Sequence, residues 1–207
     1  AGSRWPFTGT THQYYYCPYP MWMGYATSYL QKNGHEVLFY DAIAWRDGYD
    51  VFMGKVRNFN PDYIIQEISY PSIDVDLAVA EKLSQIAKVA LCGTYASVAA
   101  ESLSALPFVH AVFEGTYEEH ALELANSGVG GIYSRTEMVN LDNYPWPFRA
   151  EYMKNDSRSR FTQNNNAYTM YYDPCIPSPE PMLFTSMSRG CPFKCDFCLW
   201  PNTMYGN

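Results

Sequence analysis

Three cysteines near the end of the sequence are the residues best suited to chemistry. Cys191, Cys195 and Cys198 follow a C-x3-C-x2-C spacing. Clustered cysteines in a chain without an export signal indicate metal ligation rather than a disulfide framework. Three thiolates on one tight loop can hold three irons of a cubane iron–sulfur cluster and leave the fourth iron without a protein ligand. The amine and carboxylate of a substrate can chelate an iron that is left open in this way.

Two other interpretations of these cysteines stay open. Structural zinc requires four ligands, and no Cys or His lies close after Cys198, although Cys175 could fold back as the fourth. The three thiols could also be free and structural. The remaining cysteines, Cys17 and Cys92, are isolated along the chain, and we expect each to be a buried, inert thiol.

The composition limits the classes of partner. The chain has 207 residues with 14 Lys and Arg against 21 Asp and Glu, a formal charge of −7. This balance argues against nucleic acid as a partner, because neutralising phosphates requires a surplus of basic residues. Hydrophobic residues make up 47% of the chain, which suffices for a buried core. No apolar run reaches the roughly 18 residues that span a bilayer. We therefore expect a cytoplasmic protein without a transmembrane segment.

Helical and strand-like segments alternate from about residue 24 to residue 134. The segment 62–68 is apolar on both faces, which is typical of a strand in a parallel sheet. The alternation predicts an α/β fold with a doubly wound parallel sheet of the Rossmann or flavodoxin type. The predicted strands are 36–40, 62–68, 89–92, 111–114 and 132–133, and the predicted helices are 26–32, 51–59, 74–87, 99–106 and 118–126.

The loops at one edge of this predicted sheet carry small and hydroxyl-bearing residues. Parallel α/β sheets bind ligands at the carboxyl ends of their strands. Small residues let the backbone approach a ligand there and hydroxyls can hydrogen-bond to it, although the same residue types also simply form turns. The candidate binding residues at this edge are Asp41, Ser69, Ser72, Gly93, Thr94, Gly115, Thr116 and Tyr117.

Two further residues have simple structural explanations. His120 lies beside Glu118 and Glu119 in a predicted helix, and we expect it on a solvated face. Trp22 could line a large planar cofactor by stacking, or it could pack in the core.

The regular alternation ends near residue 135. Prolines and asparagines punctuate the next segment, which predicts a linker. Residues 183–187 then form a predicted strand that leads directly into the cysteines. We therefore divide the chain into an α/β domain over 1–134, a linker over 135–182 and the start of a second domain over 183–207.

The stretch from Ser188 to Cys198 resembles the cluster motif of the radical S-adenosylmethionine superfamily, including the aromatic Phe197 before the third cysteine. The resemblance implies a [4Fe–4S] cluster held by the three cysteines, which donates an electron to S-adenosylmethionine and generates a 5′-deoxyadenosyl radical. It also implies a partial (β/α) barrel that begins with the strand 183–187. Phe197 would then pack near the adenine, and packing in the core is the alternative.

The S-R-G-C-P lead-in is typical of members that carry an N-terminal cobalamin-binding domain, and the upstream domain resembles that module. The resemblance lies in the segments 34–37, 60–64 and 141–147. It implies that cobalamin binds at the eight candidate residues of the sheet edge. The Asp-x-His-x-x-Gly signature is absent, so a bound cobalamin would lack a histidine ligand on its lower face. The residues 1–5 and 199–201 are similar to a subgroup that includes the anaerobic magnesium-protoporphyrin ester cyclase and hopanoid-associated enzymes.

The resemblance implies an enzyme that performs methyl transfer, or radical oxidation or cyclisation, on a small-molecule substrate. Its electron donor would be of the flavodoxin or ferredoxin type. Two alternatives remain: a radical enzyme whose α/β domain is a degenerate scaffold without cobalamin, and a non-catalytic metal- or corrinoid-binding module. We expect the chain to be an N-terminal fragment that lacks the first strand of its sheet and most of its barrel, and to be inactive alone.

Overall fold

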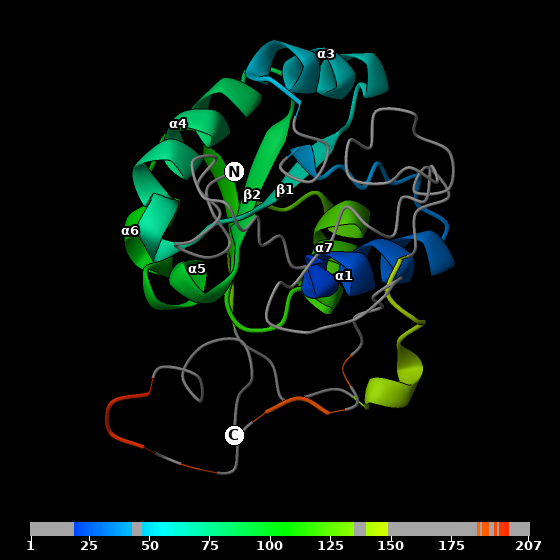
Figure 1. The fold of residues 1–207 in the computed structure, drawn as a ribbon, viewed down its shortest axis with the longest axis vertical. Helices are drawn as coiled ribbons and strands as arrows, with labels where there is room; N and C mark the ends of the chain where they lie inside the picture. Colours follow the sequence, from blue (N-terminus) through cyan, green and yellow to red (C-terminus); the bar gives the residue numbers. More distant parts are fainter. Residues whose placement is uncertain are drawn as a thin grey trace, which may run out of the picture.

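The computed structural model describes residues 19–42, 47–134 and 140–148, together with 186, 188–190, 193 and 195–198. A parallel four-stranded sheet in the order β1-β2-β3-β4 forms its centre (Figure 1). The strands are β1 (Tyr63–Glu67), β2 (Lys88–Cys92), β3 (Val109–Phe113) and β4 (Gly131–Tyr133). Because all four are parallel, their carboxyl ends meet at one edge.

Helices cover both faces of this sheet (Figure 1). The segments α1 and α7 lie side by side on one face, and α3, α4, α5 and α6 pack on the other. The helices are α1 (Met21–Lys32), α3 (Tyr49–Phe59), α4 (Ile73–Leu83), α5 (Thr94–Val98), α6 (Ala100–Ser104) and α7 (Glu118–Ser127), with 3-10 turns η1 (Tyr70–Ser72) and η2 (Leu141–Asn143).

Strand β2 shows why the sheet needs cover on both sides. Val89 and Leu91 pack with the α3–α6 layer, whereas Ala90 and Cys92 pack with α1 and α7. All four side chains are fully buried. An uninterrupted apolar strand of this kind is stable only between two helical layers, which confirms the predicted α/β fold with a parallel sheet.

Helices α3 and α7 each end at a single residue with positive φ. Helix α3 ends at Asn60, which adopts the left-handed conformation at φ 53° and precedes Pro61. Helix α7 ends at Gly128, which has φ 68°. Both positions need a residue that tolerates positive φ, and Gly and Asn are the residues that do so most readily.

The predicted strand over residues 36–40 is wrong, because these residues form no strand. Phe39 is buried instead between the rings of Tyr19 and Phe148, with ring centroids 5.9 and 5.6 Å away. A strand requires a hydrogen-bonded neighbour, and the described residues offer none to this segment. Helix α4 begins one residue before the predicted start at 74 and ends at Leu83, before the predicted end at 87, with Ser72 as its N-cap.

Part of the predicted linker packs on the α/β domain. The Phe148 N–H donates to the Gly24 carbonyl at 2.8 Å, and the Lys32 ammonium donates to the Asn143 carbonyl at 3.1 Å. The segment 140–148 therefore lies along α1. The predicted strand over 183–187 lies outside the described residues apart from Ser186. Among the described residues, no helix has the length and apolarity to cross a membrane.

Candidate metal centre

The described part of the cysteine motif is a tight, solvent-facing turn. The Cys198 N–H donates to the Cys195 carbonyl at 3.0 Å, which closes the turn between these two cysteines. Cys195 is exposed and Cys198 is partly exposed, and neither forms a disulfide. Cys191 lies outside the described residues, as does Cys175. Thiols on one open turn match the donor chemistry that an iron–sulfur cluster requires.

The described residues include two of the three predicted cysteine ligands. No group of three His, Cys, Asp or Glu side chains within the described ranges is placed to hold a metal ion. Cys191 lies outside these ranges, so three-thiolate ligation stays a prediction. Phe197 is 90% exposed, so its ring is not part of the core formed by the described residues.

The base of the cysteine loop is fixed by a buried ion pair. One terminal guanidinium nitrogen of Arg189 lies 2.5 Å from a carboxylate oxygen of Glu118, and the two side chains are 3% and 2% exposed. Glu118 occupies the first turn of α7, where the helix dipole favours a negative charge. An arginine buried to this degree requires such a counter-charge, because desolvating an unpaired cation is costly.

Three aromatic rings surround the same guanidinium. The Arg189 Cζ atom lies 4.6 Å from the ring centroid of Trp22, 5.0 Å from that of Tyr25 and 5.2 Å from that of Tyr144. These distances are within the range of cation–π attraction. We call Glu118, Trp22, Tyr25 and Tyr144 the guanidinium pocket. It joins α1, α7 and the segment 140–148 to the residues that precede Cys191.

Two further features shape the segment around Arg189. The Tyr25 hydroxyl lies 3.4 Å from both the backbone N–H and the carbonyl oxygen of Ser186. Gly190 has φ 92°, a left-handed conformation that side-chain-bearing residues rarely adopt. The chain is therefore held at Ser186 and Arg189 and turns at Gly190 into the cysteine motif.

Glu119 lies next to this pocket. Its Oε1 atom accepts a hydrogen bond from the Tyr144 hydroxyl. Burial raises the pKa of Glu119, and Glu118 raises it further, while the Glu119 backbone N–H and Arg189 act in the opposite direction. Burial also raises the pKa of Tyr29, whose ring lies 5.2 Å from that of Tyr144.

The expectation that His120 lies on a solvated face is wrong. His120 is buried, and its Nε2 atom lies 3.1 Å from the Glu114 carbonyl. Its ring lies 5.8 Å from those of both Phe113 and Tyr133. Burial lowers the pKa of His120, although the Glu114 carbonyl and nearby carboxylates act against that shift. The local sequence pattern does not predict the burial of His120, because this burial arises from the cover of α7 on more than one side.

Seven of the eight candidate cobalamin residues lie in the connections that follow the carboxyl ends of β1, β2 and β3. Asp41 instead follows the segment 36–40, which is not a strand of the sheet, so its predicted place at this edge is wrong. Ser69 and Ser72 lie with their Oγ atoms 2.8 Å apart, and the Ser72 hydroxyl donates to the Asp76 carboxylate at 2.7 Å. The Ser69 N–H donates to the same carboxylate at 3.2 Å. These polar groups are therefore used within the fold, in the connection from β1 to α4.

The two glycines of this edge also have structural explanations. A Cβ atom on Gly93, which has φ 107°, would lie 2.9 Å from the Ile68 carbonyl oxygen. The Gly115 N–H donates to the Ser97 hydroxyl at 2.9 Å, and that hydroxyl donates to the Gly93 carbonyl at 3.0 Å. Gly93 thus permits close packing of the β2 and β1 ends, and Gly115 is tied to it through Ser97.

The remaining candidate residues differ in exposure. Thr94 is exposed, Thr116 is partly exposed, and Asp41 is buried. Tyr117 is fully buried at the foot of α7. The O–H donors of Ser69 and Ser72 and the N–H of Gly115 are engaged in internal hydrogen bonds, so these donors are not free for a cobalamin. Binding of cobalamin by these residues stays a prediction.

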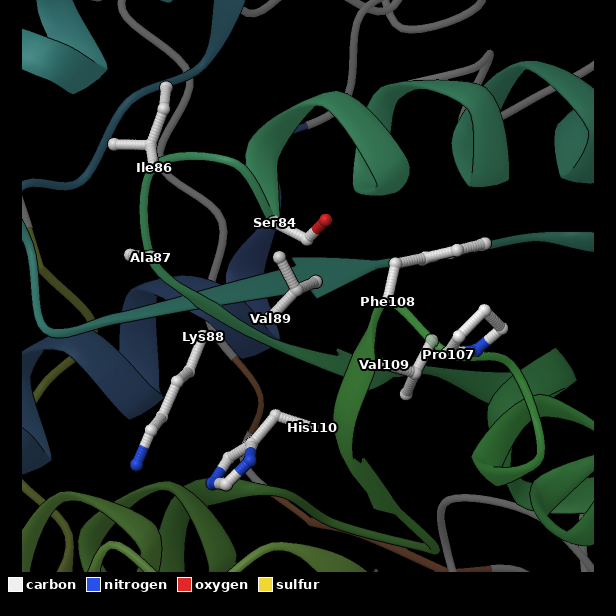
Figure 2. A pocket seen from close by; sticks show the side chains of 9 residues that line it. All are labelled: Ser84, Ile86, Ala87, Lys88, Val89, Pro107, Phe108, Val109 and His110. Atoms are coloured by element: carbon white, nitrogen blue, oxygen red, sulfur yellow. The ribbon is translucent and has the colours of Figure 1, made fainter.

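A pocket of about 430 Å³ lies at the opposite edge, by the amino ends of β2 and β3 (Figure 2). Lys88 and His110 extend to the same side of it in Figure 2. The His110 Nε2 atom lies 3.2 Å from the Gly128 carbonyl, and the Lys88 ammonium lies 5.6 Å from the Tyr63 ring centroid. This pocket is therefore remote from the strand ends where the sequence predicts a ligand.

Comparison of the chain with family models, with curated proteins and with solved structures gives no match.

Proposed function

We propose that this chain carries the iron–sulfur cluster of a radical S-adenosylmethionine enzyme and that its α/β domain is the platform for the cluster loop. The observation that supports the proposal is the open turn that carries Cys195 and Cys198. In the sequence, this turn comes shortly after Arg189, whose buried side chain anchors the chain. A structural zinc site would instead enclose its metal with four ligands.

Five residues of the loop have separate parts in this proposal. Cys195 and Cys198, with Cys191, supply the thiolates. Gly190 allows the turn into the motif, and the exposed ring of Phe197 is available to pack on the adenine of S-adenosylmethionine. The cluster, when bound, supplies one electron for the reductive cleavage of S-adenosylmethionine to methionine and a 5′-deoxyadenosyl radical.

The reaction class follows from the resemblance of the motif. We propose methyl transfer, or radical oxidation or cyclisation, on a small-molecule substrate in the cytoplasm, with an electron donor of the flavodoxin or ferredoxin type. In this proposal the α/β domain is of the cobalamin-binding, flavodoxin-like type. The internal hydrogen bonds of Ser69, Ser72 and Gly115 favour the version in which that domain is a scaffold without cobalamin.

Anaerobic reconstitution with iron and sulfide tests the metal. We expect a brown protein with about four irons and four sulfides per chain. The variants Cys191→Ala, Cys195→Ala and Cys198→Ala should each lose most of this iron. Cys175→Ala is the matched control and should keep it. Zinc uptake without the chromophore, or loss of the metal in Cys175→Ala, would refute the cluster and favour a four-ligand site.

Titration with hydroxocobalamin tests the upstream domain separately. The scaffold version predicts no change in the corrinoid absorption spectrum at saturating concentrations. Saturable binding of hydroxocobalamin, weakened in Thr94→Val or Gly93→Ala, would instead show that the domain binds cobalamin. Either result leaves the cluster proposal intact, because the thiols and the sheet edge are separate sites.

A further inference from the structure

The guanidinium pocket links two parts of the chain that the sequence keeps far apart. Glu118 begins α7 in the α/β domain, whereas Arg189 lies two residues before Cys191. Their ion pair is among the most buried charged contacts of the described residues, with both side chains no more than 3% exposed. A contact of this kind fixes the position of the chain segment that carries it.

The pocket matches a guanidinium in charge and in shape. The carboxylate of Glu118 supplies the counter-charge, and Trp22, Tyr25 and Tyr144 present rings within 4.6–5.2 Å of the Arg189 Cζ atom. A planar, weakly hydrated guanidinium suits such surroundings better than the compact, strongly hydrated ammonium of lysine. Trp22 and Tyr25 are themselves stacked on α1, with centroids 6.2 Å apart, so the pocket is built on a helix.

We propose that Arg189 is the positioning residue of the cysteine loop and that the guanidinium pocket is a binding site for guanidinium groups which Arg189 occupies within its own chain. The link to cluster chemistry rests on the proposed function, whereas occupation of the pocket does not. The Arg189 guanidinium is taken up by Glu118 and the three rings of the pocket. It acts by holding Gly190 and the cysteines that follow at a fixed place beside α1 and α7.

Removal of the Arg189 side chain tests the anchor. In Arg189→Ala we expect the amide of Cys198, which donates to the Cys195 carbonyl, to exchange its hydrogen roughly tenfold faster or more, because a buried ion pair no longer holds the loop. Reconstituted iron should fall in parallel. Arg57→Ala, which removes an exposed arginine from α3, is the matched control and should change neither quantity.

Chemical rescue separates a positioning role from a general loss of stability. Ethylguanidine at millimolar concentration should enter the vacated pocket of Arg189→Ala, slow the Cys198 amide exchange again and restore iron retention. Ethylammonium at the same concentration should do neither. In Arg189→Ala combined with Glu118→Gln the pocket lacks its counter-charge, so ethylguanidine should fail as well.

The possible results distinguish failure of the Arg189 anchor from failure of the proposed function. If Arg189→Ala retains the exchange rate and the iron of the parent chain, or if ethylammonium rescues it as well as ethylguanidine, the inference is wrong. If the parent chain holds no iron but its loop exchange responds to Arg189→Ala and to ethylguanidine as described, the proposed function fails and the anchor stands. Should Arg189→Ala not fold, Arg189→Met, which keeps the apolar stem between the rings, replaces it in the exchange measurement.

Discussion

At the scale of residues, three successive polar side chains at the start of α7 each contact other parts of the fold. Glu118 pairs with Arg189, Glu119 accepts from Tyr144, and His120 packs between two rings. Adjacent residues of a helix point in different directions, so the burial of Glu118 and His120, with Glu119 partly buried between them, means that α7 is covered on several sides. Two acids at the start of a helix predict a solvated face, and only long-range packing reverses that interpretation.

His120 gives the domain a pH dependence. Burial lowers its pKa below the ordinary 6.5, so the folded state binds fewer protons than the unfolded state. Stability from this residue is therefore present above about pH 6.5 and is lost as the pH falls below it. His120→Gln, which can still donate to the Glu114 carbonyl, should lose less stability between pH 7.5 and pH 5.5 in urea unfolding.

Comparing His120→Gln with the parent chain separates the pH dependence due to His120 from that due to Glu119. The pKa of Glu119 is raised, so its contribution has the opposite sign and increases as the pH falls towards its ordinary value of 4.5. Parallel losses in His120→Gln and the parent chain would show that His120 does not carry the pH dependence.

At the scale of elements, most of the sheet is predictable from the sequence because its strands are apolar on both faces. The helices are less so, since the predicted helix over 99–106 is in fact the short helix α6, preceded by a second short helix, α5. The segments 62–68, 89–92 and 111–114 were each predicted within two residues of the strands found. The segment 36–40 has the same apolar character but no neighbouring strand, and pairing is not visible in a local pattern. The guanidinium pocket was unpredictable for a related reason, since Glu118 and Arg189 meet only through the fold.

Two glycines provide a matched test of how the carboxyl edge is built. Gly93→Ala would force a side chain onto φ 107° with its Cβ atom 2.9 Å from the Ile68 carbonyl, which should cost on the order of 1–3 kcal/mol or more. Gly54→Ala lies within α3 with no atom near its Cβ position, and it should stabilise the fold by about 0.5–1 kcal/mol. Urea unfolding measures both, and equal effects of the two substitutions would contradict the tight contact at Gly93.

At the scale of the whole molecule, the described residues form one platform and one attached loop. Helices α1 and α7 close one face of the sheet, and the segment 140–148 and the residues around Arg189 pack on those same helices. The fold class follows from the sequence pattern, whereas the attachment of the loop follows from contacts that only the structure contains. In the proposed function, the solvent-exposed side of the cysteine turn lies at the surface of this platform.

In the proposed function, the cluster has one iron without a protein ligand, which is free to bind S-adenosylmethionine. Electron paramagnetic resonance of the reconstituted, dithionite-reduced chain tests this claim most directly. We predict the signal of a reduced [4Fe–4S] cluster whose g-values shift when S-adenosylmethionine is added. A signal that stays unchanged at saturating S-adenosylmethionine, or a chain that shows no cluster signal at all, would contradict the account.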